Sequence, residues 1–264
     1  MMRDGLGLIE IDLNFPLNEK TSIICFENDH LTNTLKQGAF YETFLIGVLN
    51  TIFDEKDQFC FYDIGANVGY HSIFVKKKFK NAKVYSFEPL PSIFSVLEKN
   101  IENNFLDITP VNVALGERSG NINIVFDESD SGNSKISSAG KVCKITSMDI
   151  ISNELSSPDF IKIDVQGFEK FVLAGAKNVI SYKRPYLIFE YCPFFEMEGS
   201  LTMNTILTAL ENIGYEFFIF RHHAGLAMEK VSANILIEID QFWKEEKWKG
   251  HFDIFAAPRR PHTK

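Results

Sequence analysis

The residues best suited to chemistry lie in one short stretch, Asp63 to His71, where an acidic residue precedes two glycines and a helical pattern. Gly65 and Gly69 can adopt positive φ angles and allow close approach of the backbone to a ligand. Asn67 lies between them. The free N–H groups at the start of the next helix favour a polar or anionic ligand group. The stretch predicts a ligand-binding turn, with a tight strand-to-helix turn that binds nothing as the alternative.

Further acidic residues follow other segments with strand composition. The acids at or just after the ends of such segments are Asp63, Glu88, Asp164 and Glu190. In open α/β sheets, ligands bind at the carboxyl ends of the strands, so we expect these acids to meet at one edge of a sheet. Glu88 has the position of the acid that accepts hydrogen bonds from ribose hydroxyls in nucleotide-binding sheets. The alternative for Glu88 is an exposed charge at a strand end.

Two acids and one histidine are candidates for a general base, which would take a proton from a reacting hydroxyl. Asp164 after a central strand is the first candidate, and Glu190 is the second. Asp164 could instead orient an amino group of a ligand, and Glu190 could pair with Arg184 or Lys183. His71 could act as a base, stack near a ligand, or be an ordinary residue of the first helical turn. Two acids are too few for a divalent cation site, so no metal is predicted.

Strands alternating with helices must position these residues, and the hydrophobic spacing predicts such a series. Strands are expected at 59–62, 82–88, 110–115, 159–164, 185–190, 215–220 and 252–257, and helices at 41–52, after the glycine turn, and at 93–101, 168–180 and 203–213. Short strands are expected before residue 38, and a hairpin with a loop between 116 and 140. Asp149 is expected to cap a helix N-terminus. The segments 127–141, 191–202 and 221–251 are expected to be irregular. Alternating strands and helices favour a three-layer α/β sandwich with a mostly parallel sheet.

Composition narrows the classes of protein. The 264 residues are 45% apolar and carry a net charge of −8, which gives no basic surface for nucleic acid. No apolar run approaches the roughly 18 residues of a membrane span, and the N-terminus lacks a signal-peptide pattern, so a cytoplasmic protein is expected. The four cysteines form no C-x-x-C pair, which favours reduced, buried thiols over zinc ligands.

Five motifs together carry a more specific resemblance. They are Asp63-Ile-Gly-Ala-Asn-Val-Gly69-Tyr-His, Phe87-Glu-Pro89, Asn112-Val-Ala-Leu-Gly116, Thr146-Ser-Met-Asp149 and Phe160-Ile-Lys-Ile-Asp-Val-Gln-Gly167. In combination they resemble the FkbM family of S-adenosylmethionine-dependent methyltransferases. The expected organisation is an N-terminal capping extension at 1–38, an FkbM-like methyltransferase domain at 39–258, and a C-terminal tail at 259–264.

The resemblance implies a Rossmann-like class I methyltransferase fold, a three-layer sandwich whose seven-stranded, mostly parallel sheet has the order 3-2-1-4-5-7-6 with the last strand antiparallel. It implies S-adenosylmethionine as the cofactor and O-methylation of a hydroxyl on a sugar, a glycan or a secondary metabolite. The expected partner is therefore a small-molecule or glycan acceptor, with no nucleic acid and no membrane span. The sequence does not determine the oligomeric state.

The expected cofactor contacts follow the first motifs. Gly65, Asn67 and Gly69 would form the backbone cradle. Asp63 would bind the amino-acid end of the cofactor, Glu88 the ribose hydroxyls and Asn112 the adenine side.

One departure from the family pattern keeps a second interpretation open. The family usually has glutamate between Val165 and Gly167, where this chain has Gln166 without the charge. A non-catalytic S-adenosylmethionine-binding protein is therefore the main alternative. A nicotinamide-dependent oxidoreductase is less favoured, because its fingerprint needs glycine where this chain has Asn67 and Tyr70.

Overall fold

The computed structural model describes residues 7–13, 20–126, 131, 134–136, 139–193, 201–220, 228–247 and 251–259. The chain divides into two compact units. The first comprises Met1–Ala114 and Gly120–Ile145, and the second comprises Leu115–Ser119 and Thr146–Lys264. The boundaries predicted from the sequence at residues 38 and 258 stay predictions.

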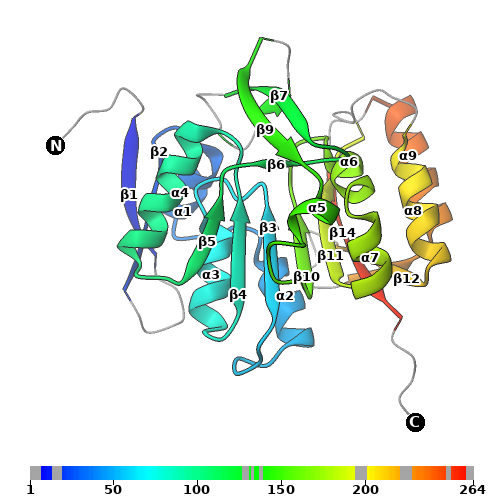
Figure 1. Ribbon diagram of the computed structural model, residues 1–264, viewed down its shortest axis with the longest axis horizontal. Coiled ribbons are helices and arrows are strands. Elements are labelled where there is room, and N and C mark those ends of the chain that lie inside the picture. Colours follow the sequence, from blue (N-terminus) through cyan, green and yellow to red (C-terminus); the bar gives the residue numbers. More distant parts are fainter. Residues whose placement is uncertain are drawn as a thin grey trace. The chain divides into compact units, whose positions relative to one another are not determined.

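The first unit is built on three parallel strands, β3 (Cys60–Ile64), β4 (Lys83–Phe87) and β5 (Ile108–Val111), in the order β5-β4-β3. Helix α3 (Tyr70–Lys78) follows β3, and α4 (Pro91–Asn103) follows β4 (Figure 1). Every residue of β3 is buried, as expected for a strand covered on both faces. The predicted 3-2-1 part of the strand order is confirmed.

The N-terminal segment of this unit forms a separate antiparallel pair, β1 (Leu8–Leu13) and β2 (Thr21–Phe26). The amide of Asn100 on α4 accepts a hydrogen bond from Ile24 N–H at 2.7 Å and donates to Ile24 O at 2.9 Å, which ties β2 to α4. Helices α1 (His30–Lys36) and α2 (Thr43–Ile52) follow. Helix α2 confirms the predicted apolar stripe, whereas α1 was not predicted.

The chain after β5 contains short strands rather than one long one. They are β6 (Ala114–Leu115), β7 (Gly120–Val125), β8 (Lys135–Ile136) and β9 (Lys141–Thr146), and β7 pairs antiparallel with both β8 and β9. The predicted strand 110–115 is therefore wrong at its end. Val113 N–H bonds to Val111 O at 2.9 Å, and this tight turn ends β5. The predicted hairpin is confirmed.

The sheet of the second unit is mixed. β10 (Phe160–Ile163) runs parallel to β11 (Tyr186–Tyr191), and β14 (Phe252–Pro258) lies antiparallel between β11 and β12 (Tyr215–Phe220) (Figure 1). An additional strand, β13 (Met228–Val231), pairs with β12. The predicted 4-5-7-6 part of the order and the antiparallel last strand are confirmed.

The helices of the second unit are α5 (Met148–Ile151), α6 (Glu169–Ala174), α7 (Lys177–Lys183), α8 (Met203–Asn212) and α9 (Ala233–Glu245). The prediction of a single helix at 168–180 is wrong. The helix is interrupted at Gly175 and Ala176, which separate α6 from α7. The prediction of an irregular 221–251 segment is also wrong, since β13 and α9 lie there. The buried residues of α9 are Ala233, Leu236 and Asp240, so only two of them are apolar.

Two predictions from composition can be compared with the structure. Cys25, Cys60, Cys143 and Cys192 are all buried and form no disulfide, as expected. Among the residues that the structure describes, no helix has both the length and the apolar character needed to cross a membrane.

Candidate functional site

The turn between β3 and α3 has the backbone geometry that its glycines predict. Gly65, Asn67 and Gly69 have φ angles of 79°, 50° and 92°, all in the left-handed region. The N–H groups of Gly65 and Ala66 both donate to Phe87 O at 3.0 Å, which holds the turn against the end of β4. Asparagine is one of the few side-chain-bearing residues that tolerates this region well. The three predicted cradle residues therefore share one ordered turn.

Replacing Gly69 should destabilise this turn strongly. A Cβ atom at Gly69 would lie 2.6 Å from Cδ1 of Leu97, which is fully buried on α4, and φ is +92°. We expect Gly69→Ala to lower the free energy of unfolding by about 1–3 kcal/mol, measured by urea denaturation. Gly38→Ala is the matched control, because Gly38 has φ of +71° but nothing within 4 Å of the added Cβ. Equal losses in the two variants would rule out the steric contribution of Leu97.

Asp63 is fully buried and lies at the end of β3. Its Oδ2 accepts a hydrogen bond from Ser72 Oγ at 2.6 Å, and Ser72 Oγ lies 2.6 Å from Ser86 Oγ on β4. Neither serine was predicted from the sequence, although Ser86 is a polar residue among the buried residues of β4. This contact joins the start of α3 to β3 and β4. The predicted contact of Asp63 with the amino-acid end of a cofactor stays a prediction.

Glu88 follows β4 and is buried, so the alternative of an exposed strand-end charge is wrong. Its Oε2 accepts a hydrogen bond from Asn67 N–H at 3.2 Å, and its Oε1 accepts one from Leu90 N–H at 2.9 Å. Burial raises the pKa of Glu88 to about 7, against the lowering effect of these two N–H donors. A carboxylate oxygen can accept two hydrogen bonds, so each Glu88 oxygen retains capacity for a ligand hydroxyl.

Asn112 lies beside Glu88. Its Nδ2 donates to Glu88 O at 2.8 Å and to Pro89 O at 3.1 Å, and its side chain is exposed. These bonds fix the chain just after β4. A contact with the adenine side of a cofactor stays a prediction.

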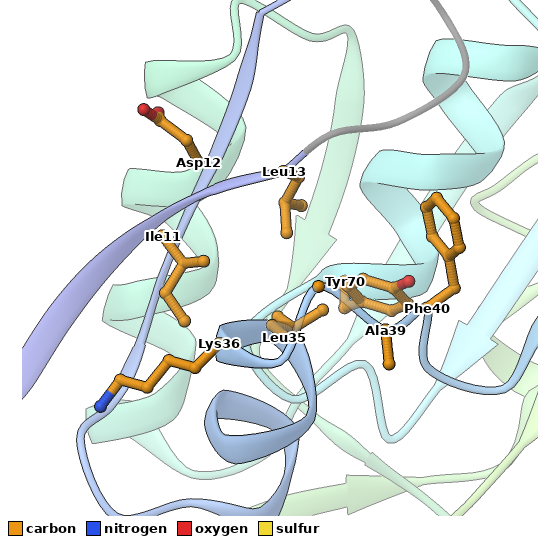
Figure 2. Close-up of a pocket in the computed structure, with 9 residues that line it drawn as sticks. Ile11, Asp12, Leu13, Leu35, Lys36, Ala39, Phe40 and Tyr70 are labelled. Carbon is orange, nitrogen blue, oxygen red and sulfur yellow. The ribbon is translucent and has the colours of Figure 1, made fainter.

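A separate cavity of about 210 Å³ lies next to Tyr70, the first residue of α3. Figure 2 shows Leu13, Leu35 and Phe40 gathered near Tyr70, while the charged ends of Asp12 and Lys36 point away from it. Its walls come from β1, from α1 and from the chain that follows α1. None of the predicted site residues is among the described residues that line it.

The two predicted base candidates of the second unit lie close together. Gln166 Nε2 donates to Asp164 Oδ1 and to Glu190 Oε2, both at 3.2 Å. Lys162 Nζ donates to Asp164 Oδ2 at 3.1 Å. Gln166 has a φ angle of 53°, which bends the chain after β10 and directs this contact. One amide group therefore joins the two carboxylates, and it does so as a donor that an ionised glutamate could not supply.

His251 was missed by the sequence analysis, and it joins the same cluster. Its Nε2 lies 3.5 Å from Glu190 Oε1. The signal was available, because an antiparallel last strand begins beside the end of its parallel neighbour, and Glu190 pairs in register with Asp253. Arg184, which the sequence offered as a partner of Glu190, instead donates to the carbonyl oxygens of Ile213 and Gly214.

Glu169, also missed by the sequence analysis as a site residue, holds the turn that carries Gln166. Its Oε1 accepts hydrogen bonds from Val165 N–H and Gly167 N–H, both at 3.1 Å. The side chain is buried, and burial raises the pKa of Glu169 to about 7. This carboxyl group is thus a counterpart of Glu88, since both are buried acids that fix backbone N–H groups of a turn.

Two other residues from the sequence analysis occupy defined places. His71 is buried on α3, with Nε2 3.2 Å from Glu42 Oε2 and its ring beside Tyr41. A role for His71 as a base stays a prediction. The capping box predicted for Asp149 over 146–149 is wrong, because Asp149 instead caps α7, where its carboxylate accepts hydrogen bonds from the N–H groups of Asn178 and Val179. The α5 N-cap is Ser147.

Comparisons with known proteins identify related sequences. Residues 63–217, more than half of the chain, match the family model described as "Methyltransferase FkbM domain". "Hexuronic acid methyltransferase AglP" of Haloferax volcanii is 33% identical over 125 residues, which cover 45% of this chain and 50% of that protein. "Methyltransferase 1" of Beauveria bassiana is 25% identical over 114 residues, covering 42% of this chain and 46% of that protein. The matches thus span half or less of the length of these relatives.

A solved structure shows the same fold. The crystal structure of methyltransferase FkbM from Methylobacillus flagellatus KT matches 78% of this chain and 45% of its own, with a TM-score of 0.50 and 18% sequence identity. At this level of identity the likeness concerns the fold alone. It agrees with the class I methyltransferase architecture expected from the sequence.

Proposed function

The chain belongs to the FkbM family of methyltransferases, and on this premise we propose that it transfers a methyl group from S-adenosylmethionine to a hydroxyl oxygen of a sugar or glycan. When bound, S-adenosylmethionine supplies a methyl group on a sulfonium, which is already activated for transfer. The protein then has to bind this cofactor, hold the acceptor oxygen in line, and remove the hydroxyl proton.

The first unit supplies the cofactor contacts in this proposal. The backbone of Gly65, Asn67 and Gly69 forms the cradle. Asp63 orders this turn through its hydrogen bond with Ser72, and it binds the amino-acid end of the cofactor. Glu88 accepts hydrogen bonds from the two ribose hydroxyls through the capacity that its oxygens retain. The polar groups of these residues and the left-handed turn both fit such a ligand. Asn112, which lies next to Glu88, is assigned to the adenine side of the cofactor.

The proposal of a hydroxyl acceptor is supported by the hydrogen bonds through which Gln166 joins Asp164 and Glu190. In the proposed reaction Asp164 would take the proton of the acceptor hydroxyl as its oxygen bonds to the methyl group. The bond between that methyl group and the sulfonium sulfur would break, leaving S-adenosylhomocysteine as the second product. Glu190 and Gln166 orient Asp164 from one side, and Lys162 donates to its other oxygen. An acceptor carboxylate would already be ionised and would need no base, so this cluster favours a hydroxyl.

The sugar or glycan acceptor is supported by the relative whose name describes a hexuronic acid methyltransferase. Since that match covers half of the relative, uronic acids are the first acceptors to test rather than an assigned substrate.

The test combines binding and turnover. At about 100 times its Kd, S-adenosylhomocysteine should stabilise the protein by about 2.7 kcal/mol, which is roughly 5–11 °C in melting temperature. Turnover with S-adenosylmethionine and glucuronic or galacturonic acid glycosides should then give a product heavier by one methylene unit. A methyl ether survives mild alkali, whereas a methyl ester is hydrolysed, so alkali treatment separates a hydroxyl acceptor from a carboxylate acceptor.

The outcomes separate the competing functions. A thermal shift with S-adenosylhomocysteine but no turnover across sugar acceptors would favour the non-catalytic cofactor-binding alternative. A shift with NADH instead would favour an oxidoreductase. An alkali-labile product would leave methyl transfer standing and overturn the hydroxyl acceptor.

A further inference from the structure

A buried aspartate outside the predicted site is connected to the cofactor turn. Asp29 is the N-cap of α1, where its Oδ1 accepts a hydrogen bond from Leu31 N–H at 2.9 Å. Its Oδ2 accepts two more hydrogen bonds, from Ser131 N–H at 3.0 Å and from Ser131 Oγ–H. Asp29 is 3% exposed and Ser131 is 5% exposed. A buried carboxylate is costly unless it is hydrogen-bonded, and here each oxygen has at least one donor.

The direction of the hydrogen bond between Ser131 and Asn67 depends on the single proton of the Ser131 hydroxyl. Asn67 Nδ2 lies 2.9 Å and Asn67 Oδ1 lies 3.1 Å from Ser131 Oγ. Because the hydroxyl proton is donated to Asp29, Ser131 Oγ accepts from Nδ2 rather than donating to Oδ1. The main-chain N–H of Asn67 in turn donates to Glu88 Oε2 at 3.2 Å. A continuous chain of hydrogen bonds therefore runs from Asp29 through Ser131 and Asn67 to Glu88, entirely within the first unit.

We propose that Asp29 and Ser131 are positioning residues for cofactor binding, which act by fixing the side chain of Asn67 and, through it, the turn beside Glu88. The proposal rests on the cofactor site given under Proposed function. Neither residue needs to touch the cofactor. Asn67 tolerates its left-handed backbone, but that backbone does not determine where its amide points, and Ser131 supplies the partner that does.

This role explains why three segments that are distant in sequence meet at one hydroxyl. Asp29 and Ser131 are 102 residues apart, and Asn67 and Ser131 are 64 apart. Asp29 in the N-terminal segment and Ser131, which lies between β7 and β8, thereby support the turn after β3. Loss of either contact should leave Asn67 free to rotate, so the cofactor would have to order the turn on binding.

Asp29→Asn separates positioning from structural capping. Asparagine is as good an N-cap as aspartate, so its Oδ1 can still accept from Leu31 N–H. Its Nδ2 would instead face Ser131 N–H, and two donors cannot bond to each other. We expect the Kd for S-adenosylhomocysteine and the KM for S-adenosylmethionine to rise about tenfold. The melting temperature should fall, because the buried Ser131 N–H loses its acceptor, and kcat at saturating cofactor should not change.

Variants of Ser131 test the path through the hydroxyl. Ser131→Ala should raise the same Kd by a similar factor, and Ser131→Thr, which keeps a hydroxyl, should restore most of the affinity. The double variant Asp29→Asn/Ser131→Ala should be no weaker than either single variant, because both changes break the same chain of contacts. Ser232→Ala is the matched control, since it removes the N-cap of α9 and should lower stability without changing the Kd.

The results distinguish this inference from the proposed function. Wild-type affinity in both Asp29→Asn and Ser131→Ala, with Glu88→Ala still binding much more weakly than the wild type, would overturn the positioning role alone. A lowered melting temperature without a change in Kd would also overturn it and would leave a structural role. Absence of any binding by the wild type would overturn both.

Discussion

Glu88→Ala is expected to raise the Kd for S-adenosylhomocysteine at least about 100-fold. Each hydrogen bond from a ribose hydroxyl to a charged carboxylate contributes about 1.5–3 kcal/mol, and about 1.4 kcal/mol is a factor of ten in affinity. Isothermal titration calorimetry on the purified protein measures this change directly. The expectation combines the position of Glu88 after β4 with the capacity that its two oxygens retain for further donors.

The control must separate the loss of a contact with the ligand from the loss of hydrogen bonds that support the turn. Alanine at 88 also removes the acceptor of two backbone N–H groups, those of Asn67 and Leu90, so some loss of stability is expected. Glu169→Ala makes the same kind of loss in the other unit, where the carboxylate supports Val165 and Gly167. Glu169→Ala should therefore lower stability without a comparable loss of affinity. Similar affinity losses in both variants, or none at Glu88, would remove the ribose assignment.

The same carboxyl group predicts a pH dependence of binding. Burial raises the pKa of Glu88 to about 7, and ligand hydroxyls donate to its ionised form. Binding should therefore lower this pKa and release a proton near neutral pH, and affinity should fall by up to about tenfold per pH unit below pH 7. Calorimetry in two buffers of different ionisation enthalpy measures the proton. Glu88→Gln should show no such release.

Glu88 also makes the folding stability depend on pH, in the direction opposite to that of cofactor affinity. Its pKa is raised above the ordinary value of 4.5, so the folded state binds more protons than the unfolded state between pH 4.5 and about 7. The stability contributed by its protonated form is fully present below pH 4.5 and is lost as the pH rises through 7. The cofactor-free protein should thus lose some stability over the range in which it gains cofactor affinity.

Asp164→Asn is expected to lower kcat by about 10²- to 10⁴-fold, the usual contribution of a general base. The Kd for S-adenosylhomocysteine should stay near the wild-type value, because Asp164 is proposed to act on the acceptor proton. Steady-state kinetics with a sugar acceptor, together with calorimetry, measure both quantities. A loss of cofactor affinity with an unchanged kcat at saturation would assign Asp164 to the amino group of the cofactor instead.

Gln166→Glu and Glu190→Gln probe the surroundings of the base. Glutamate at 166 would replace a shared donor with a third carboxylate beside Asp164 and Glu190, which should raise a carboxyl pKa in the cluster. Turnover near neutral pH should then fall and should recover at higher pH. Glu190→Gln removes one charge and should have a smaller effect. A large gain of turnover in Gln166→Glu would instead favour the non-catalytic alternative for the natural chain.

Local patterns in the sequence were sufficient to predict much of this protein. Glycines at 65 and 69 permit a left-handed backbone, which the turn adopts, and a hydrophobic period of two or of 3.6 residues distinguishes strand from helix locally. The acids Glu88, Asp164 and Glu190 were predictable because they end or follow strands, and a strand end is visible in the sequence. Strand order within each unit followed from the family resemblance rather than from periodicity.

The contacts that give these residues their environment were decided by the tertiary structure. Asp29, Ser131 and Asn67 meet although 102 residues separate the first two, and no local pattern records such a meeting. His251 reaches Glu190 only because β14 runs antiparallel beside β11. The burial that raises the pKa of Glu88 and Glu169 likewise depends on the packing around them. Sequence thus determined which groups stand at the ends of strands, and folding determined what each of them touches, because hydrogen bonds and desolvation depend on distance in space rather than along the chain.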